Sequence, residues 1–143
     1  LHRRRHSFPT RRSSDLWKVS ELEPFLSLDA HFVSLQYKDA SQEVGGRITQ
    51  YRTATLTDDY DDTAALVASL DLVITMQTAV AHLAGALGVP CIVFVPNTGQ
   101  WRYGFPEEET TPWYRSLQVV HQRGDWKEAK ERAMAKVRAL GHH

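Results

Sequence analysis

The chain has 143 residues, enough for one domain with a hydrophobic core of its own. It is 42% hydrophobic and 24% charged, with a mean hydropathy of −0.41, which is an ordinary composition for a globular protein. No apolar run approaches the ~20 residues that a membrane-spanning helix needs, so we expect no integral membrane segment. The single cysteine, Cys91, excludes an internal disulfide framework and a multi-cysteine metal site. Because it lies in an apolar run, we expect its thiol to be buried and unreactive, and we expect the protein to be cytoplasmic.

The first sixteen residues, LHRRRHSFPTRRSSDL, differ in composition from the rest. Such an Arg-rich segment could be a nucleic-acid-binding arm or a transit peptide. SFPTRRSSDL, however, resembles the translation of a common sequencing adaptor, so we expect residues 1–16 to be artefactual and disordered and the natural N-terminus to be missing. The domain then spans residues 17–141. The whole chain has a formal net charge of zero, and without residues 1–16 the charge is −4. We therefore expect no nucleic-acid partner.

The first part of the domain contains weaker structural signals than the second. Residues 17–29 are amphipathic but are interrupted by Pro24. Residues 31–37 alternate and are rich in β-formers, which predicts a strand. Residues 41–48 could form a helix, although two adjacent glycines weaken that prediction. Residues 51–56 predict a second, shorter strand.

An acidic loop follows at residues 57–62 and leads into a predicted helix over residues 62–70. Acidic residues at a helix N-terminus suit its dipole. The apolar run at residues 72–75 then predicts a buried strand. A turn at residues 76–78 would begin the next helix, with Thr78 as a plausible N-cap.

The helix after Thr78 has apolar residues at helical spacing. Gly88 and Pro90 would end it, and residues 91–95 predict a second buried strand. Residues 97–111 predict a long loop, and residues 117–121 predict a last strand. Residues 126–140 predict an amphipathic helix with Glu-to-Lys/Arg pairs on its outer face. The predicted core is Val33, Leu35, Leu66, Leu72, Val73, Ile74, Val80, Leu83, Leu87, Ile92, Val93, Phe94 and Val119, with Ala129, Ala133, Met134, Val137 and Leu140 from the last helix.

About five strands alternate with helices in this pattern. The pattern predicts an α/β fold with a single Rossmann-like, open and mainly parallel sheet flanked by helices. Ligands bind such sheets beyond the carboxyl ends of the strands, where helix N-termini point. Gln77, Thr78 and the backbone N–H groups of Ala79 and Val80 are therefore expected at an anion-binding position.

The segment LVITMQTAVAHLAGALGVPCIVFVP, followed by QWRYG and later by PWYRSLQVVHQ, resembles the C-terminal half of family 9-type glycosyltransferases. These heptosyltransferase-like proteins include versions attached to bacterial tetratricopeptide repeats. The resemblance covers roughly residues 32–122. It implies one half of a two-domain GT-B fold that binds a nucleotide diphosphate sugar without a cofactor. It also implies that the partner is either a missing N-terminal half or tetratricopeptide repeats.

The resemblance and the predicted topology together suggest a set of donor-binding residues. Lys38 and Arg102 could neutralise phosphate charge, or they could be solvated surface cations. His82 lies one turn after Thr78 and so on the same helix face. The resemblance places His82 near the donor, whereas a packing role is the plainer alternative. The full candidate set is Gln36, Lys38, Gln77, Thr78, Ala79, Val80, His82, Trp101 and Arg102.

Aromatic residues could provide a flat wall for the base or could simply anchor loops. These are Trp101, Tyr103, Trp113 and Tyr114. The histidines show no metal-ligand spacing, so no metal site is expected. The sequence identifies no catalytic residue, because the acidic residues at 58–62 are better explained as a solvated loop.

Gln77 departs from the resembled family, which typically has Asp at this position. A glutamine can accept and donate hydrogen bonds, but it cannot carry charge or act as a base. Either the sugar of the donor differs or catalysis has been lost in this copy. Because the other half of a GT-B enzyme normally carries the acceptor site, we expect this chain alone to be inactive.

Three functions remain open at this point. The first is the donor-binding domain of an inverting, metal-independent glycosyltransferase. The second is a non-catalytic interaction module of a tetratricopeptide-repeat protein. The third, a GT-B-type epimerase, requires paired catalytic carboxylates near the cleft, and the sequence offers none.

Overall fold

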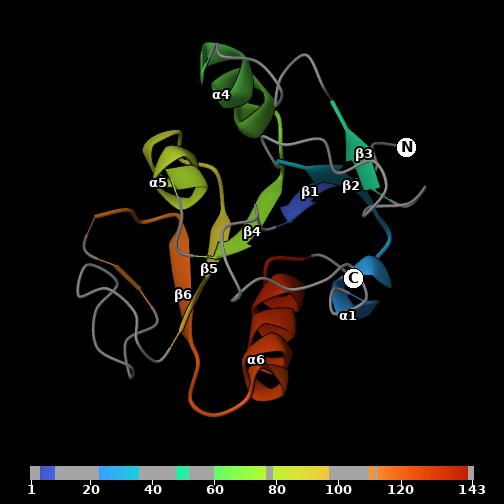
Figure 1. The fold of residues 1–143 in the computed structure, drawn as a ribbon, viewed down its shortest axis with the longest axis vertical. Coiled ribbons are helices and arrows are strands. Elements are labelled where there is room, and N and C mark those ends of the chain that lie inside the picture. The colour runs from blue at the N-terminus through green and yellow to red at the C-terminus, as the bar shows by residue number, and fades with distance from the viewer. Residues whose placement is uncertain are drawn as a thin grey trace.

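A six-stranded sheet organises the protein in a computed structural model, which describes residues 4–8, 23–35, 48–51, 60–76, 79–96, 110–111 and 113–141 (Figure 1). The strand order is β3-β2-β1-β4-β5-β6, and every neighbouring pair runs parallel. The strands are β1 (Arg4–Phe8), β2 (Ala30–Ser34), β3 (Ile48–Gln50), β4 (Leu72–Met76), β5 (Cys91–Val95) and β6 (Leu117–His121). The predicted α/β fold with an open parallel sheet is confirmed.

Helices cover both faces of this sheet (Figure 1). The short helix α1 (Glu23–Leu26) and the long helix α6 (Trp126–Ala139) contribute to one apolar layer. Helices α4 (Tyr60–Ala68) and α5 (Ala79–Ala86) contribute to the other. Within the described residues, no helix combines the length and the apolar character needed to cross a bilayer.

The central strands β4 and β5 are buried along their whole length. Their side chains alternate between the two layers. Leu72, Ile74 and Met76 face the layer of α1 and α6, whereas Val73 faces the layer of α4 and α5. Since both faces are covered, these strands need continuous apolar runs rather than an alternating pattern.

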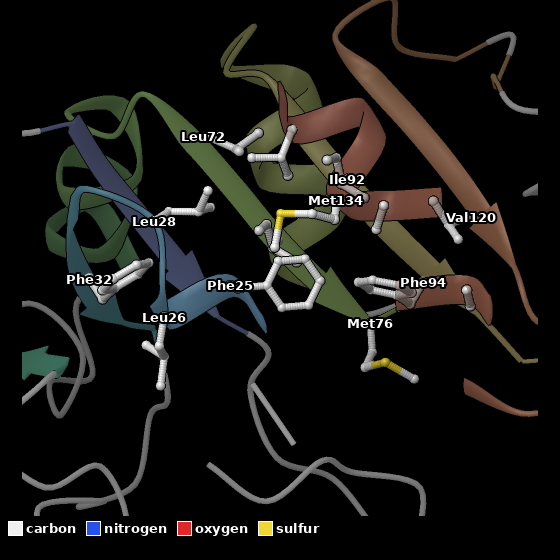
Figure 2. Close-up of a cluster of buried hydrophobic side chains, with 14 of the residues drawn as sticks. Phe25, Leu26, Leu28, Phe32, Leu72, Met76, Ile92, Phe94, Val120 and Met134 are labelled. Atoms are coloured by element: carbon white, nitrogen blue, oxygen red, sulfur yellow. The ribbon is translucent and has the colours of Figure 1, made fainter. Parts of the chain in front are cut away.

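An edge-to-face contact between Phe25 and Phe94 joins α1 to β5 (Figure 2), and a second such contact joins β5 to α6. The Phe25 and Phe94 rings meet edge to face with centroids 6.2 Å apart, and Phe94 meets Trp126 in the same way at 6.1 Å. Phe25 and Phe94 are both fully buried. A helix as short as α1 is not stable by itself, so the burial of Phe25 holds it in place.

Helix α5 ends at a glycine, as the sequence predicts. Gly88 has a φ of +69°. Its N–H donates to the Gly85 carbonyl at 3.1 Å, and the Val89 N–H donates to the Ala84 carbonyl at 2.9 Å. These two bonds form a Schellman motif, which uses Gly88 because a left-handed residue without Cβ is unstrained.

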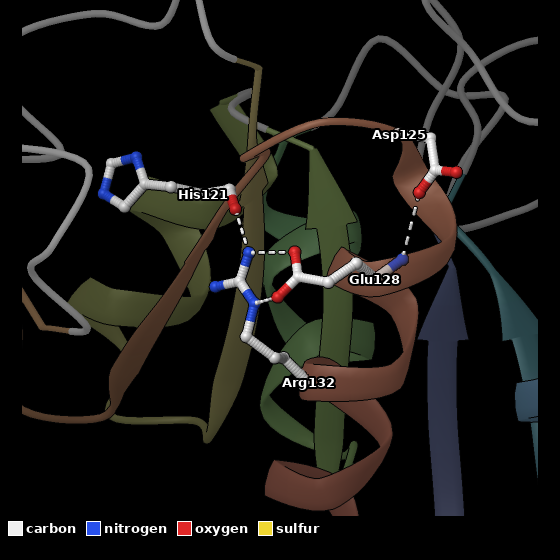
Figure 3. A network of polar contacts seen from close by, with 4 residues as sticks. All are labelled: His121, Asp125, Glu128 and Arg132. Carbon is white, nitrogen blue, oxygen red and sulfur yellow. Dashed lines mark hydrogen bonds and ion pairs between the residues drawn. The ribbon is translucent and has the colours of Figure 1, made fainter.

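Helix α6 begins at a side-chain cap and is tied to the end of β6 (Figure 3). The Glu128 N–H donates to the Asp125 carboxylate at 3.3 Å. Arg132 donates to both oxygens of the Glu128 carboxylate, at 2.5 and 3.0 Å, and also to the backbone carbonyl of His121. The predicted Glu-to-Arg pair is confirmed here. Its additional bond to His121 fixes α6 against the last strand.

Several sequence predictions differ from the structure. The N-terminal segment was expected to be disordered, yet Arg4–Phe8 form β1 in the middle of the sheet. Strand β3 lies at Ile48–Gln50, just before the strand predicted over residues 51–56, and that prediction lies outside the described residues except at Tyr51. The helix predicted over residues 41–48 lies outside the described residues except at Ile48, which with the β-branched Thr49 pairs with β2. Pro24 lies in the first turn of α1, where its missing N–H costs nothing.

The predicted core is largely confirmed, with exceptions on the helices. Leu87 is 42% exposed and Leu140 is 38% exposed. Helix α5 instead turns its small residues Ala81 and Ala84 to the sheet, so Leu87 lies away from it. Leu66, Val80 and Leu83 are half-buried at the edge of the same layer. Cys91 is buried as predicted, and burial raises the pKa of its thiol.

The Glu128–Arg132 pair predicts a specific pH dependence of stability. The hydrogen bond from Arg132 lowers the pKa of the Glu128 carboxyl. A carboxyl with a lowered folded-state pKa contributes stability above its unfolded pKa and loses it as the pH falls through the folded value. Glu128→Gln should therefore lower the melting temperature by about 1–2 °C at pH 7, and the difference from the parent protein should vanish at strongly acidic pH.

The matched control is Glu131→Gln, an exposed glutamate on the same helix. Circular dichroism melts from pH 7 down to about pH 3 would compare the two variants with the parent. A difference between Glu128→Gln and the parent that stayed constant over this range would contradict the assignment.

Candidate functional site

The strand order places a topological switch point between β1 and β4. The connection from β4 through α5 leads to β5, on the far side of β4 from β1. In open α/β sheets the crevice for ligands lies at such a point, beyond the carboxyl ends of the strands. Strand β4 ends at Met76 and α5 begins at Ala79, so the N-terminus of α5 lies at this edge.

The first turn of α5 is suited to an anion. The first N–H groups of a helix have no intrahelical acceptor, and the helix dipole adds partial positive charge. Ala79 is exposed and Val80 is half-buried, and the first turn contains no acidic residue. Two of the predicted site residues, Ala79 and Val80, therefore have the expected position.

Most of the other predicted site residues lie outside the described residues. These are Gln36, Lys38, Gln77, Thr78, Trp101 and Arg102. Their positions along the chain relative to the strands are nevertheless clear. Gln77 and Thr78 connect β4 to α5, and residues 36–38 come shortly after β2. Their roles remain predictions.

His82 packs against an aromatic ring from a distant part of the chain. Its ring meets Tyr114 edge to face, with centroids 5.9 Å apart and an interplanar angle of 67°. His82 is half-buried, and Tyr114 lies against the layer of α4 and α5. This contact agrees with the packing role for His82. A role of His82 near a donor stays a prediction.

Tyr114 also lies close to Gly85, which belongs to α5 like His82. A Cβ added at Gly85 would lie 2.4–2.8 Å from three atoms of the Tyr114 ring. The Tyr114 carbonyl also accepts from the Leu117 N–H at 3.3 Å, so the residue sits just before the amino end of β6. The structure thus identifies Tyr114 as an anchor for the chain entering β6, and it lies at the edge of the sheet opposite the N-terminus of α5. This place agrees with the loop-anchoring alternative for Tyr114, and a role beside a base stays a prediction.

Trp113 precedes this anchor and is 60% exposed. Its N–H donates to the Thr111 hydroxyl at 3.2 Å, and Thr110 forms an isolated antiparallel bridge with Gln118 of β6. Trp113 therefore also belongs to the amino-end edge. This place agrees with the loop-anchoring alternative, and a role of Trp113 beside a base stays a prediction.

The polar network at the end of β6 was only half predicted. The spacing of Glu128 and Arg132 indicated their pair, but nothing in the sequence indicated that Arg132 also bonds the His121 carbonyl. His121 is the last residue of β6, so this guanidinium lies at the carboxyl edge. Among the described residues, no three acidic, histidine or cysteine side chains form a potential metal site.

Known proteins share this fold, although no protein-family profile matches the chain. Protein FlbA of Caulobacter vibrioides is 37% identical over 116 residues, which is 75% of this chain and 19% of FlbA. The structure of E. coli ADP-heptose LPS heptosyltransferase II aligns with 96% of this chain and 46% of its own, with a TM-score of 0.59 and 14% identity. A family 9 glycosyltransferase from Veillonella parvula aligns with 92% of this chain and 39% of its own, with a TM-score of 0.54 and 13% identity.

The chain therefore has the heptosyltransferase-like, family 9-type fold that its sequence resembles. It spans less than half of each solved structure and about a fifth of FlbA. The comparison supports one Rossmann-like half of a GT-B fold. The attachment to tetratricopeptide repeats and the adaptor origin of residues 1–16 remain predictions.

The contact between Gly85 and Tyr114 predicts an unusual response to alanine. In an ordinary helix interior, Gly→Ala stabilises by up to about 1 kcal/mol. At Gly85 the new methyl group would overlap the Tyr114 ring, and overpacking costs about 1–3 kcal/mol. Gly85→Ala should therefore lower the free energy of unfolding by about 1 kcal/mol in urea denaturation.

A double-mutant cycle checks the cause of that loss. In a Tyr114→Ala background the ring is absent, so Gly85→Ala should become stabilising. Stabilisation by Gly85→Ala in the parent chain would show that the ring does not pack there.

Proposed function

We propose that this chain is the nucleotide-sugar donor-binding part of a metal-independent GT-B glycosyltransferase. The observation that carries the proposal is the likeness over 96% of the chain to a structure whose name specifies an ADP-heptose heptosyltransferase. The N-terminus of α5 at the switch point supports it independently, because that position suits a diphosphate. A cytoplasmic location and transfer of a hexose or heptose by the parent protein belong to the same proposal.

The diphosphate of the donor would bind the N–H groups at the start of α5. Thr78, Ala79 and Val80 would donate to phosphate oxygens, and Lys38 and Arg102 would neutralise their charge. Gln77 would hydrogen-bond the sugar, and Gln36 and Trp101 would contact the rest of the nucleoside. His82 would support the helix from its Tyr114-facing side.

The chain alone would bind a donor weakly and would transfer nothing. In a two-domain transferase the ligand lies between the halves, and this chain spans less than half of the solved structures it resembles. The missing half would supply the acceptor site and complete the exclusion of water.

A non-catalytic module is the second candidate function. The match to FlbA supports it, because the matched region is only 19% of that protein, so a similar domain there is one part of a much longer chain. Gln77 in place of the Asp of the resembled family points the same way. In this case the domain would support tetratricopeptide repeats or another part of a long protein.

A nucleotide titration followed by NMR tests donor binding. With ADP, the amides of Ala79 and Val80 should shift, with an affinity of roughly 1 mM for the isolated chain. Adenosine, which lacks the diphosphate, should leave these amides unchanged. Thr78→Val should weaken the shifts and, through loss of the predicted cap, destabilise the protein by about 1 kcal/mol.

The same titration separates the two candidate functions. No shift of the α5 amides with any nucleoside diphosphate, in this chain or in its full-length parent, would reject donor binding and leave the module.

Gln77→Asp in the full-length parent tests whether catalysis has been lost. If Gln77 marks lost activity, the variant should gain transferase turnover by at least about tenfold, equivalent to ~1.4 kcal/mol of transition-state stabilisation. If Gln77 serves a different sugar, the variant should lose turnover with the native donor. Gln77→Asn is the control for side-chain length at constant charge, and an unchanged rate in both variants would remove Gln77 from the site.

A further inference from the structure

Helix α5 contacts the sheet through small side chains. Ala81 and Ala84 are fully buried in the layer that α5 shares with α4, whereas Leu87 is 42% exposed. The direction of a helix on its neighbours is set by ridges of side chains that fit into grooves, and an alanine adds only one methyl group to such a ridge. The sheet therefore fixes the distance of α5 from its strands better than it fixes the direction of the helix.

The ring of Tyr114 lies along one flank of α5. Two residues that it contacts, His82 and Gly85, are three positions apart and so share a helix face. The rings of Tyr114 and His82 meet edge to face with centroids 5.9 Å apart. At Gly85 the ring approaches so closely that a Cβ there would lie 2.4 Å from the Tyr114 Cγ. The ring therefore packs against the helix backbone itself at Gly85, where no side chain can turn aside.

Tyr114 is in turn bound to the sheet. Its carbonyl accepts a hydrogen bond at 3.3 Å from the N–H of Leu117, the first residue of β6. Two residues along, the Ser116 carbonyl accepts at 3.0 Å from the N–H of Cys91, the first residue of β5. Residues 114–117 are thus joined to both strands. The position of α5 against the Tyr114 ring is therefore a position relative to the sheet.

We propose that Tyr114 is a positioning residue. Its ring sets the direction of α5 relative to the sheet, and so the direction in which the N–H groups of Ala79 and Val80 point. Nothing in this role requires Tyr114 to contact a ligand. Its consequence for binding rests on the proposed function, in which these N–H groups donate to the donor diphosphate.

The expected displacement is large enough to matter for a hydrogen bond. Ordinary contact begins at 3.4 Å, so a methyl group at Gly85 would move the ring and the helix apart by about 1 Å. A helix of eight residues is about 12 Å long, and a displacement of about 1 Å at one end tilts it by about 5°. Donor–acceptor distances in hydrogen bonds to oxygen span only about 0.5 Å, so such a change in α5 weakens the bonds that its first N–H groups make.

Residual dipolar couplings of the 143-residue chain without nucleotide test the proposal directly. They report the direction of each N–H group, so the couplings of α5 can be compared with those of β4 and β5. Tyr114→Leu removes the ring, and Gly85→Ala pushes against it. Each should change the α5 couplings to those of a helix tilted by about 5° and leave the strand couplings unchanged. Tyr114→Phe keeps the ring and should match the parent.

The matched control is Val137→Ala, because Val137 is fully buried in the other apolar layer. It should lower the melting temperature, as Tyr114→Leu does, and leave the α5 couplings unchanged.

A titration of the same four variants with ADP connects the direction of α5 to binding. Tyr114→Leu and Gly85→Ala should weaken ADP affinity by about threefold or more, whereas Tyr114→Phe and Val137→Ala should stay within about twofold of the parent.

Two results would overturn the proposal. One is a set of α5 couplings that Tyr114→Leu and Gly85→Ala leave unchanged, or that Val137→Ala changes equally. The other is an ADP affinity that every destabilised variant lowers alike. If the parent chain does not bind ADP, the proposed donor site fails, and the couplings still decide whether Tyr114 directs α5.

Discussion

The complete enclosure of β4 and β5 is the constraint on which the rest of the structure depends. Both faces of these strands are covered, by α1 and α6 on one side and by α4 and α5 on the other. Every side chain in them must then be compatible with an apolar layer, and every backbone polar group must be paired within the ladder. Polar groups of this part of the sheet can contact a ligand only where the strands end. The β4-to-α5 turn is such a place, which is why the donor site is proposed there.

The sequence predicted best the elements whose signals are local. The apolar runs at β4, β5 and β6 and the amphipathic pattern of α6 have the predicted bounds within a residue. Gly88 ended α5 as expected, because its positive φ is a local requirement. By contrast, the orientation of α5 depends on contacts with residues far along the chain. Ala81 and Ala84 face the sheet and Leu87 does not. Helical spacing alone could not show this, because Ala81 and Ala84 on one face and Leu83 and Leu87 on another both recur every three or four residues.

The candidate site was predictable only as far as it follows from helix geometry. Ala79 and Val80 could be placed at the carboxyl edge because a helix that follows a buried parallel strand must begin there. Tyr114 and Trp113 belong to the opposite edge, since the chain approaches β6 from its amino end. Neither this path nor the bond from Arg132 to the His121 carbonyl has a signal in the sequence, because each depends on where β6 lies relative to its neighbours.

The C-terminal end of α5 is anchored, and this matters for any ligand at its start. Its C-terminal half is fixed by the Schellman turn at Gly88 and by the Tyr114 ring against Gly85, and the same ring meets His82 in the middle of the helix. The helix has eight residues and so is about 12 Å long. An anchor at one end of such a short, rigid rod sets the direction in which the N–H groups at the other end point. Tyr114 can therefore influence the proposed diphosphate position without contacting a ligand.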